Sequence, residues 1–391
     1  MSKANPVSQA NPNLLILSDG GNYHVQKWMA ALVAEGLRVT LASFHPYPKP
    51  VPGVEFVPMT PPVNLRGRLG LGDFLLGRRE VNRVIEAVQP DVLMASYATH
   101  YGSLGARSGF RPLIVQTWTM DLTVYPFKGW RRWLLRPLVR HALGTADVVT
   151  TDGPGLAAEG RRLWPGVADK LVPTTWGIRL ADYDPSPAVE AEARAQWDIP
   201  AGAPVVLSPR GVFWYYRPEI VLPALLQILD ERPEVYALAL TVTQERTEAV
   251  QALLDRLDAH PRGRVADRFL QVSEMRGAWA MADVFVSAPV FDGISEAVLE
   301  GMYAGGIPVV SDIPSNRSFL TDGTSALFVP DETIDDLAAA LHRALDELPA
   351  LKQTLAPRNR AWIAEHASVE GTARQVAGLV RRLAQENQVP T

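Results

Sequence analysis

Residues 283–310 read DVFVSAPVFDGISEAVLEGMYAGGIPVV, and they decide the fold class because two apolar segments flank a helical pattern. The first segment, DVFVSA (283–288), and the last, IPVV (307–310), have the length and composition of buried parallel strands. Between them, Ser295 is suited to cap a helix over residues 296–304, and a pair of glycines ends that helix. A strand–helix–strand unit of this kind predicts a parallel sheet covered by helices.

Short apolar segments alternate with helical patterns along the rest of the chain. This alternation favours doubly wound parallel sheets with helices on both faces. The alternation pauses in the Pro- and Ala-rich stretch 185–203, which indicates a connection between domains. The predicted strands are 14–19, 38–44, 54–59, 91–97, 112–118, 147–152 and 170–176 before this stretch, and 204–210, 235–242, 283–288, 307–312 and 326–330 after it.

The two series of strands predict an α/β protein with two tandem Rossmann-like domains. We expect an N-terminal domain at 1–184, a partly helical linker at 185–203 and a C-terminal domain at 204–391. A helical segment closes the chain, and its terminal helix, at about 368–386, could return to the N-terminal domain. Open sheets of this type bind ligands beyond the carboxyl ends of their strands, so a cleft between the two domains is the expected binding site.

The composition excludes several classes of protein. The 391 residues are 47% hydrophobic and 20% charged with a net charge of −4, which is typical of a globular enzyme and gives no global attraction to nucleic acid. No cysteine is present, so disulfides, thiol nucleophiles and thiolate zinc sites are excluded. The first dozen residues lack the apolar run of a signal peptide, and no segment reaches the ~18–20 apolar residues of a membrane span. The cytoplasm is therefore the expected compartment.

The start of the helix after Ser295 is the part of this segment that is suited to bind a ligand. Its free backbone amides and the positive end of its dipole predict an anion site suited to a phosphate. Asp292 lies on the preceding loop, and Glu300 could accept hydrogen bonds from both hydroxyls of a ribose. Arg210 ends a predicted strand and Arg217 begins the next helix, and a guanidinium can hold two oxygens of a diphosphate. A nucleotide diphosphate pocket is the prediction; an ordinary surface loop with arginines paired to surface carboxylates is the alternative.

Several segments resemble the family-4 retaining glycosyltransferases, which have the two-domain GT-B fold and use nucleotide-sugar donors. The most specific is DGISEAVLEGMYAGGIPVVSD (292–312), which is similar to the family's acid–x7–acid element, in the variant whose first acid is Asp followed by Gly. The family pattern continues through SDIPSNRSFLTDGTSALFVP (311–330). Weaker matches are SPRG (208–211), TTWGIRLADYDP (174–185) and SDGGNYHVQKWMAALVAEGLRV (18–39), and the likeness covers roughly residues 13–385.

The resemblance implies a role for each matched position. Asp292 would contact the transferred sugar near its reacting carbon, and Glu300 would hold the ribose. Arg210 would stabilise the charge that grows on the departing diphosphate, with Arg217 as a further cation near the donor. No metal or cofactor is expected, because cations and a helix dipole take the place of a metal. The backbone amides that would touch the sugar and the phosphates are those of Gly293, Ile294 and Ser295.

The N-terminal domain is expected to bind the acceptor. Asp121 matches the Asp of the family's His-Gly-x-Asp element and is a candidate catalytic residue, whereas Trp118 stands where the family has its His. A capping or turn role is the alternative for Asp121, and a surface position or a bond to the backbone is the alternative for the histidines. The candidate acceptor-side residues, all near the carboxyl ends of predicted strands, are Gly20, Gly21, His24, His100 and Trp118.

One stretch, FKGWRRWLLRPLVRHAL (127–143), interleaves cations with tryptophans and leucines. This pattern predicts weak association with the inner face of a membrane, or a lipid-linked acceptor. NLRGRLGLGDFLLGRR (64–79) has a similar composition. The alternative is a solvated helix face whose apolar side packs on the sheet.

Together these features predict a retaining glycosyltransferase of carbohydrate biosynthesis. It would move a sugar from a nucleotide diphosphate donor to a hydroxyl of a glycan, a lipid-linked or a small-molecule acceptor. The chain has no G-x-x-x-x-G-K-[ST] motif, which argues against an NTPase, and nucleic acid is not an expected partner. Two alternatives remain: a nucleotide-sugar epimerase on the same scaffold, and a non-catalytic protein that binds a sugar nucleotide.

Overall fold

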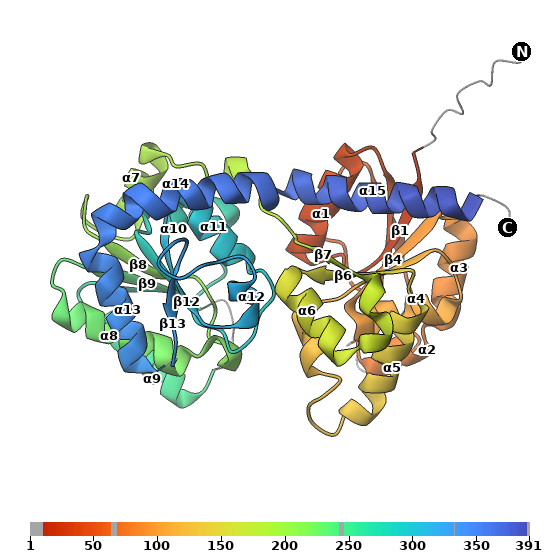
Figure 1. Ribbon diagram of the computed structural model, residues 1–391, viewed down its shortest axis with the longest axis horizontal. Coiled ribbons are helices and arrows are strands. Elements are labelled where there is room, and N and C mark those ends of the chain that lie inside the picture. Colours follow the sequence, from red (N-terminus) through yellow and green to blue (C-terminus); the bar gives the residue numbers. More distant parts are fainter. Residues whose placement is uncertain (1–10, 64–68, 242–245, 332, 389–391) are drawn as a thin grey trace, which may run out of the picture. The chain divides into compact units, whose positions relative to one another are not determined.

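The computed structural model describes residues 11–63, 69–241, 246–331 and 333–388, and the chain divides into two compact units. Unit 1 comprises Met1–Trp176 together with Val369–Thr391, and unit 2 comprises Gly177–Ser368. Each unit contains a parallel sheet with helices on both faces, which confirms the predicted fold class (Figure 1). The predicted cleft between the domains stays a prediction.

Unit 1 is built on a seven-stranded sheet in the order β3-β2-β1-β4-β5-β6-β7. The first six strands repeat the 3-2-1-4-5-6 order of doubly wound nucleotide-binding folds, in which the order reverses between β1 and β4. All seven predicted strands of this half are present. They are β1 (Asn13–Leu17), β2 (Arg38–Ser43), β3 (Val54–Pro58), β4 (Val92–Ser96), β5 (Leu113–Gln116), β6 (Val148–Asp152) and β7 (Leu171–Thr174).

The two faces of this sheet are buried because both are covered by helices. Leu14 and Ile16 of β1 pack toward α1 (Tyr23–Ala34) and α15 (Val369–Gln388). The alternate residues of the same strand pack on the opposite face, as the two-residue period of a strand requires. Since α15 follows unit 2 in the sequence, unit 1 takes part of its core from a segment beyond unit 2. The helices on the second face are α3 (Arg78–Val88), α4 (Gly102–Ser108), α5 (Arg132–Thr145) and α6 (Pro154–Leu163), beside the short α2 (Leu71–Leu76).

Unit 2 repeats the same topology in a six-stranded sheet with the order β10-β9-β8-β11-β12-β13. The strand order reverses between β8 and β11, which are hydrogen-bonded neighbours. The strands are β8 (Val205–Ser208), β9 (Tyr236–Leu240), β10 (Gly263–Ala266), β11 (Val284–Ser287), β12 (Ile307–Ser311) and β13 (Leu327–Val329). The helices are α7 (Pro187–Gln196), α8 (Pro218–Glu231), α9 (Glu248–Ala259), α10 (Val272–Met281), α11 (Glu296–Ala304), α12 (Pro314–Arg317), α13 (Ile334–Asp346) and α14 (Leu348–His366).

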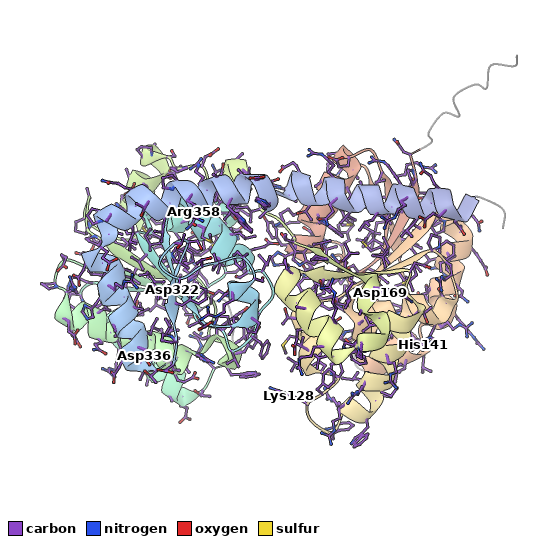
Figure 2. The ribbon with its side chains drawn as sticks, viewed as in Figure 1. Lys128, His141, Asp169, Asp322, Asp336 and Arg358 are labelled. Carbon is purple, nitrogen blue, oxygen red and sulfur yellow. The ribbon has the colours of Figure 1, made fainter. Side chains whose placement is uncertain are left out.

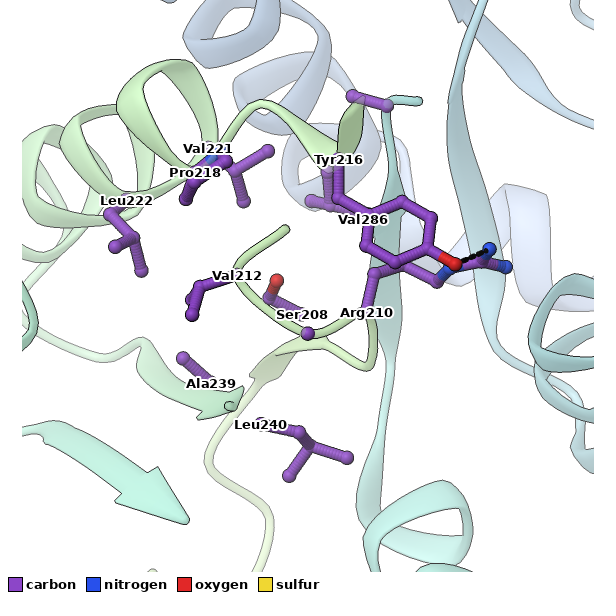
Figure 3. Close-up of a pocket in the computed structure, with 12 residues that line it drawn as sticks. Ser208, Arg210, Val212, Tyr216, Pro218, Val221, Leu222, Ala239, Leu240 and Val286 are labelled. Carbon is purple, nitrogen blue, oxygen red and sulfur yellow. Dashed lines mark hydrogen bonds between the residues drawn. The ribbon is translucent and has the colours of Figure 1, made fainter. Parts of the chain in front are cut away.

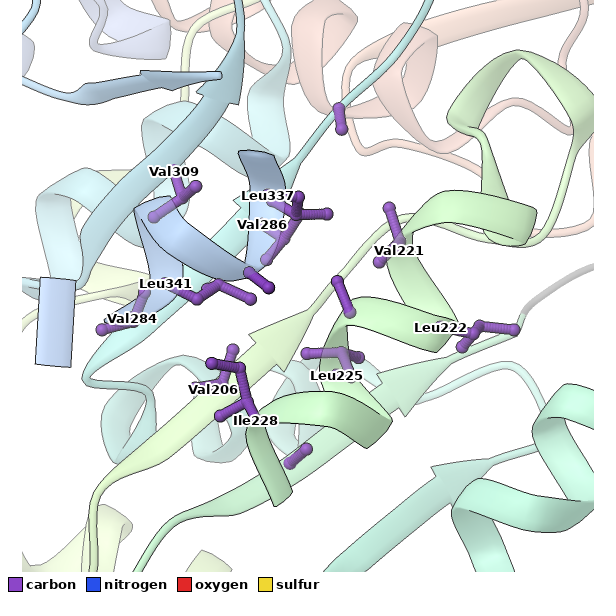
Figure 4. Close-up of a cluster of buried hydrophobic side chains, with 14 of the residues drawn as sticks. Val206, Val221, Leu222, Leu225, Ile228, Val284, Val286, Val309, Leu337 and Leu341 are labelled. Atoms are coloured by element: carbon purple, nitrogen blue, oxygen red, sulfur yellow. The ribbon is translucent and has the colours of Figure 1, made fainter. Parts of the chain in front are cut away.

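Valines of the central strands form the core between the sheet and its first helical layer. Val206 of β8 and Val286 of β11 pack against side chains of α8 and α13, and all of them are buried (Figure 4). On the opposite face, Phe285 and Trp279 pack under α11, with their rings 5.3 Å apart. These two cores fix the carboxyl ends of β8 and β11, from which the loops of the candidate site extend.

The stretch expected to be a partly helical linker, 185–203, contains α7, because Ser186 caps this helix and Pro187 occupies its first turn. The structure differs from the expected boundaries and elements in two places. The first compact unit ends at Trp176, whereas residue 184 was expected. Strand β10 was not predicted, because GRVA offers only two apolar residues. The terminal helix is present as α15 and belongs to unit 1.

The stretch 127–143 includes most of α5, and the related stretch 64–79 lies outside the described residues over 64–68. Within the described parts of the chain, none of the helices combines the length and the apolar composition needed to cross a bilayer.

Candidate active site

Arg210 and Asp292 meet at the point where the strand order of unit 2 reverses. Arg210 follows β8, and Asp292 lies on the loop after β11, so both side chains lie beyond the carboxyl ends of neighbouring strands. In doubly wound sheets this is where ligands bind. Nη2 of Arg210 donates a hydrogen bond of 2.7 Å to Oδ2 of Asp292. The prediction named both residues, and the structure pairs them directly.

Tyr216 holds the guanidinium of Arg210 from a second side. Nη2 of Arg210 also donates a 2.7 Å hydrogen bond to the Tyr216 hydroxyl, and the guanidinium carbon lies 4.3 Å from the centre of the Tyr216 ring. Burial acts to lower the pKa of Arg210, but Tyr216 and Asp292 outweigh it and raise that pKa overall. Arg210 is thus a largely buried, always charged group held in one orientation.

The loop that carries Tyr216 is tied to the loop that carries Asp292. A short helical turn, Trp214–Tyr216, ends at Arg217, which adopts a left-handed backbone with φ +52° and caps α8. The amide of Val290 donates a 2.8 Å hydrogen bond to the carbonyl of Tyr215. Arg217 begins the helix as predicted, and its role toward a donor stays a prediction. The two loops are therefore joined directly by a backbone hydrogen bond.

A small pocket of about 320 Å³, counted with its open mouth, lies beside Arg210 (Figure 3). Ser208, Arg210 and Tyr216 supply its polar groups. The other walls are mostly apolar side chains of β9, β11 and α8, as Figure 3 shows for Leu240, Val286 and Val221. A cation beside an apolar pocket is suited to an anion that carries an apolar or planar group.

The helix after Asp292 has the predicted bounds. α11 runs over Glu296–Ala304, Ser295 is its N-cap residue, and Gly305 ends it with φ +98°. The side chain of Ser295 does not cap the helix; its Oγ is buried and has no hydrogen-bond partner among the described residues. Gly293 donates its amide to Oδ1 of Asp292 at 2.9 Å. Asp292 therefore accepts one bond from its own loop and one from Arg210, directly before a helix N-terminus.

Ile294 lies between these groups but has a different environment. Its side chain is buried in the apolar core under α11. It anchors the loop, so only its backbone could take the predicted part in binding. That part, like those of Gly293 and Ser295, stays a prediction.

Glu300 is held by two neutral donors from other elements. Its Oε1 accepts a 2.7 Å hydrogen bond from the Tyr183 hydroxyl, and its Oε2 accepts a 3.0 Å bond from Nε1 of Trp279. Trp279 is 1% exposed, so the indole cannot shift without repacking the core. The direction of the carboxylate is fixed by the fold, and its predicted role at a ribose stays a prediction.

Asp121 of unit 1 is buried and binds backbone. Its Oδ1 accepts the amide of Trp118 at 2.7 Å, and its Oδ2 accepts the amide of Ala98. Burial raises the pKa of Asp121 to about 7, although these backbone bonds act to lower it. The carboxyl joins the loops after β4 and β5, which is the turn role that the sequence left open. Its catalytic assignment stays a prediction.

Trp118 is part of an aromatic cluster at the carboxyl edge of unit 1. Its ring stacks on Tyr97 with centroids 4.8 Å apart and an angle of 12°, and it lies 4.7 Å from Trp176. Nε1 of Trp118 is covered and has no hydrogen-bond partner among the described residues. Tyr97 has a left-handed backbone, φ +61°, directly after β4. Strained residues of this kind often occur at ligand sites.

The two candidate histidines occupy different settings. His24 lies in the first turn of α1, as predicted, and its ring is 6.2 Å from that of Trp118. His100 lies in the π-helical turn Tyr97–Tyr101, and its Nδ1 is 2.9 Å from Oγ1 of Thr99. Burial lowers the pKa of His100 to about 4, so it is neutral at physiological pH. His24 therefore lies beside Trp118, whereas His100 lies beside Tyr97, the ring that stacks on Trp118.

The two glycines after β1, Gly20 and Gly21, contact neighbouring parts of the chain. A Cβ on Gly20 would lie 3.1 Å from the carbonyl oxygen of Pro46 and 3.2 Å from the side chain of Tyr47. Gly20 thus lets the loop after β2 pack closely. Gly21 is exposed, and its amide bonds to Oδ1 of Asp19 at 2.8 Å. A role at the acceptor stays a prediction for both.

The chain matches two protein families that together cover most of its length. The family described as glycosyl transferase 4-like matches residues 13–153. The family described as glycosyl transferases group 1 matches residues 204–347, which include Arg210, Asp292 and Glu300. The chain belongs to the family-4-like glycosyltransferases of the GT-B fold.

Solved structures share the fold of this glycosyltransferase at low sequence identity. Sucrose-phosphate synthase from Thermosynechococcus elongatus matches with a TM-score of 0.80 and 18% identity, over 96% of this chain and 100% of that chain. HepE from Anabaena, in complex with UDP and glucose, matches with 0.76 and 16%, over 95% and 100%. The catalytic domain of starch synthase IV from Arabidopsis thaliana, bound to ADP and acarbose, matches with 0.74 and 13%, over 96% and 100%. Among curated proteins, none matches the chain.

Sequence reasoning missed three side chains that contact the predicted site of this glycosyltransferase. Tyr216 binds Arg210, and Tyr183 and Trp279 bind Glu300. The aromatic run GVFWYY after Arg210 was a signal for Tyr216, because it lies on the loop between a strand end and a helix start. No local pattern marks the other two, since Tyr183 is 117 residues from Glu300 and Trp279 is 21 residues away.

Proposed function

We propose that this glycosyltransferase transfers a sugar from a nucleotide diphosphate sugar to a hydroxyl group of an acceptor, with retention of the anomeric configuration. The observation that carries the proposal is the Arg210–Asp292 pair beside the N-terminus of α11, at the reversal point of the sheet. A fixed cation and a helix N-terminus are suited to a diphosphate. An acid next to them is suited to the sugar that the diphosphate carries.

The charges change in a definite way during such a transfer. The bond between the anomeric carbon and the diphosphate oxygen breaks, and both electrons stay on the diphosphate. The acceptor oxygen forms the new bond to the same carbon, and its proton passes to an oxygen of the departing diphosphate. Arg210 would stabilise the negative charge on that leaving group, which grows only as the bond breaks. Fixed charges that act in this way are often the largest catalytic contribution.

The donor site needs no divalent metal under this proposal. Arg210 and the amides at the start of α11 supply the positive charge that a metal would otherwise provide. We expect activity to persist when divalent cations are chelated with EDTA. Loss of activity in EDTA, with recovery on addition of magnesium or manganese, would contradict this part of the proposal.

Nucleotides bound to proteins with the same fold support the same proposal by analogy. HepE from Anabaena was solved with UDP and glucose, and starch synthase IV with ADP and acarbose. For this chain we propose a nucleotide-sugar donor, with unit 1 binding a glycan, lipid-linked or small-molecule acceptor. Weak contact with a membrane surface, suggested by the cationic stretch 127–143, is part of this proposal.

Thermal unfolding with a panel of donors tests the donor half. A UDP-, GDP-, ADP- or dTDP-sugar that binds the native protein raises its melting temperature by mass action. With the donor known, proton NMR of the product made from an added acceptor reports the anomeric configuration. Conversion of the donor without any acceptor would favour an epimerase instead. Tight donor binding without transfer or donor hydrolysis would favour a non-catalytic binding protein.

A further inference from the structure

Helix α5 has two apolar faces, and only one of them is covered by unit 1. Val139, Ala142 and Leu143 lie in the core against the sheet. On the other side, the side chains of Trp130 and Trp133 are 77% and 76% exposed. A surface helix ordinarily needs one apolar face, so the second face calls for an explanation.

The exposed apolar side chains form a stripe along the helix. The amides of Trp133 and Leu134 bond to the carbonyls of Trp130 and Arg131, so the helical turn begins before the first residue of α5. Leu134 is 41% exposed and Pro137 is exposed as well. Trp130, Trp133, Leu134 and Pro137 therefore follow the i, i+3, i+4, i+7 spacing of one helix face. We call these four residues the α5 stripe.

The chain segment around the α5 stripe carries charge of one sign. No Asp or Glu occurs from residue 122 to residue 146. The guanidinium of Arg131 lies 5.5 Å from the Trp130 ring, and that of Arg132 lies 4.9 Å from the Trp133 ring. Figure 2 labels Lys128, on the loop that leads into α5, and His141, on α5 itself. The exposed cations, none of which forms an ion pair with a described residue, are Lys128, Arg131, Arg132, Arg136 and Arg140.

We propose that the α5 stripe and these five cations bind the surface of an anionic lipid bilayer. Indole rings favour the boundary between headgroups and acyl chains, because one edge is polar and the rest is apolar. Arginine guanidinium groups bind lipid phosphates while their stems lie along the apolar layer. A cationic segment without acids is complementary to anionic lipids and repels a second copy of itself, which favours the bilayer over self-association. This inference deepens the membrane contact included in the proposed function, because it names the surface and the class of lipid, and it holds whichever sugar is transferred.

Flotation of the full-length protein with vesicles tests the proposal. We expect binding to vesicles of phosphatidylcholine and phosphatidylglycerol in equal parts, little binding to phosphatidylcholine alone, and loss of binding at high salt. The double variant Trp130→Ser/Trp133→Ser, and separately Arg131→Glu/Arg132→Glu, should each lower the partition coefficient by about tenfold or more. These side chains are exposed, so the variants should fold normally, as an unchanged melting temperature would confirm.

Matched substitutions in unit 2 serve as controls. Phe269 is 72% exposed, and Phe269→Ser removes a comparable apolar side chain from another surface. Arg256→Glu/Arg358→Glu makes the same change in net charge at exposed positions of α9 and α14. Both controls should bind vesicles like the wild type. Donor-induced thermal shifts should be equal in all variants, which separates failure of this proposal from failure of the proposed function.

Three results would overturn the proposal. One is a wild-type protein that does not float with the anionic vesicles at low salt. Another is that both α5 variants bind the anionic vesicles as strongly as the wild type does. The third is a wild-type dimer in sedimentation velocity that the Trp130→Ser/Trp133→Ser variant abolishes without any change in vesicle binding, because a second copy would then cover the stripe.

Discussion

Arg210 and Asp292 are 82 residues apart in the sequence and form a 2.7 Å ion pair at the carboxyl ends of adjacent strands. Their side chains are only 12% and 21% exposed, so each partner satisfies the charge of the other in the absence of ligand. A diphosphate that binds Arg210 would compete with Asp292 for the same guanidinium. Under the proposed function, the pair would link binding of the diphosphate to the freedom of the Asp292 carboxylate.

Asp292→Asn should separate turnover from donor binding. We expect a fall in kcat of at least about tenfold, since the charge near the reacting sugar is lost. Donor affinity should be unchanged or higher, because Arg210 then has no competing carboxylate. Steady-state kinetics and calorimetric titration of the donor measure the two effects. Asp346→Asn removes a carboxylate that pairs with Arg232 on the surface, and it should change neither quantity.

Tyr216→Phe should lower kcat by positioning Arg210 less well. The variant keeps the ring under the guanidinium but loses the 2.7 Å hydrogen bond. A misplaced charge at a developing leaving group costs rate, and we expect a loss of about tenfold with a smaller change in KM. Tyr236→Phe is the matched control, because Tyr236 also stacks with an arginine, Arg264, at 5.7 Å. Tyr236 is the first residue of β9, so it lies at the amino-terminal end of its strand, whereas the site lies at the carboxyl ends. Equal kcat in both variants would contradict the positioning role.

Glu300→Ala should weaken donor binding. If Glu300 holds the ribose, its loss should raise the donor Kd by about tenfold or more, since hydrogen bonds to a charged group contribute about 1.5–3 kcal/mol. Tyr183→Phe removes only one of the two bonds that orient the carboxylate, so a smaller rise in Kd with nearly unchanged kcat is expected. Isothermal titration of the nucleoside diphosphate gives the Kd for both variants, and steady-state kinetics gives kcat. An unchanged Kd in Glu300→Ala would exclude this residue from the donor site.

Gly301→Ala should destabilise unit 2 although alanine favours helices. A Cβ at this position would lie 2.6 Å from both Phe285 and Trp279, two buried rings of the core. Overpacking of this kind typically costs about 1–3 kcal/mol, more than the gain of up to about 1 kcal/mol in helix propensity. In α15, Gly378 has no atom within 4 Å of its added Cβ, so Gly378→Ala should stabilise instead. Denaturant unfolding of the two variants should therefore shift in opposite directions.

Asp121 should make the stability of unit 1 fall as pH rises from about 4 to about 7. Burial raises its pKa from 3.8 to about 7 in the folded chain, so the folded state binds more protons than the unfolded state across this range. Stability due to this group is complete below the unfolded pKa and is lost as pH rises through the folded pKa, by roughly 4 kcal/mol in total.

The Asp121→Asn variant tests the direction of this change in stability with pH. The variant should be less stable at pH 5, because an amide cannot accept both backbone bonds, but its urea midpoint should lack the extra fall between pH 5 and pH 8. Parallel pH dependence in the wild type and the variant would show that Asp121 ionises normally in the folded chain.

The sequence predicted the sheets and the helix bounds of the site well, because these depend on local patterns. Ser295, a nine-residue helix and Gly305 are adjacent signals, and α11 has the predicted ends. Strand β10 was missed because its glycine is required by a close contact: a Cβ on Gly263 would lie 1.9 Å from the carbonyl oxygen of Leu257. Tertiary contacts of this kind have no local signature.

The same limit explains what was missed at the site. The pairing of Arg210 with Asp292 could be anticipated, since both follow neighbouring strands of a doubly wound sheet. The bond from Trp279 to Glu300 depends on how α10 packs beside α11, which no spacing in the sequence specifies. The burial of Asp121 depends likewise on two loops that meet only in the folded unit.

The return of α15 to unit 1 has a consequence for synthesis of the protein on the ribosome. Val376, Ala377 and Val380 are buried against the same core as Trp28, yet they are translated after the whole of unit 2. Unit 2 can fold as soon as its continuous segment has emerged, whereas unit 1 must wait with an open apolar groove until α15 has emerged as well. The unit whose strands are translated first thus completes its core after unit 2, and a nascent chain cut short before Val369 would leave that groove for a chaperone to shield.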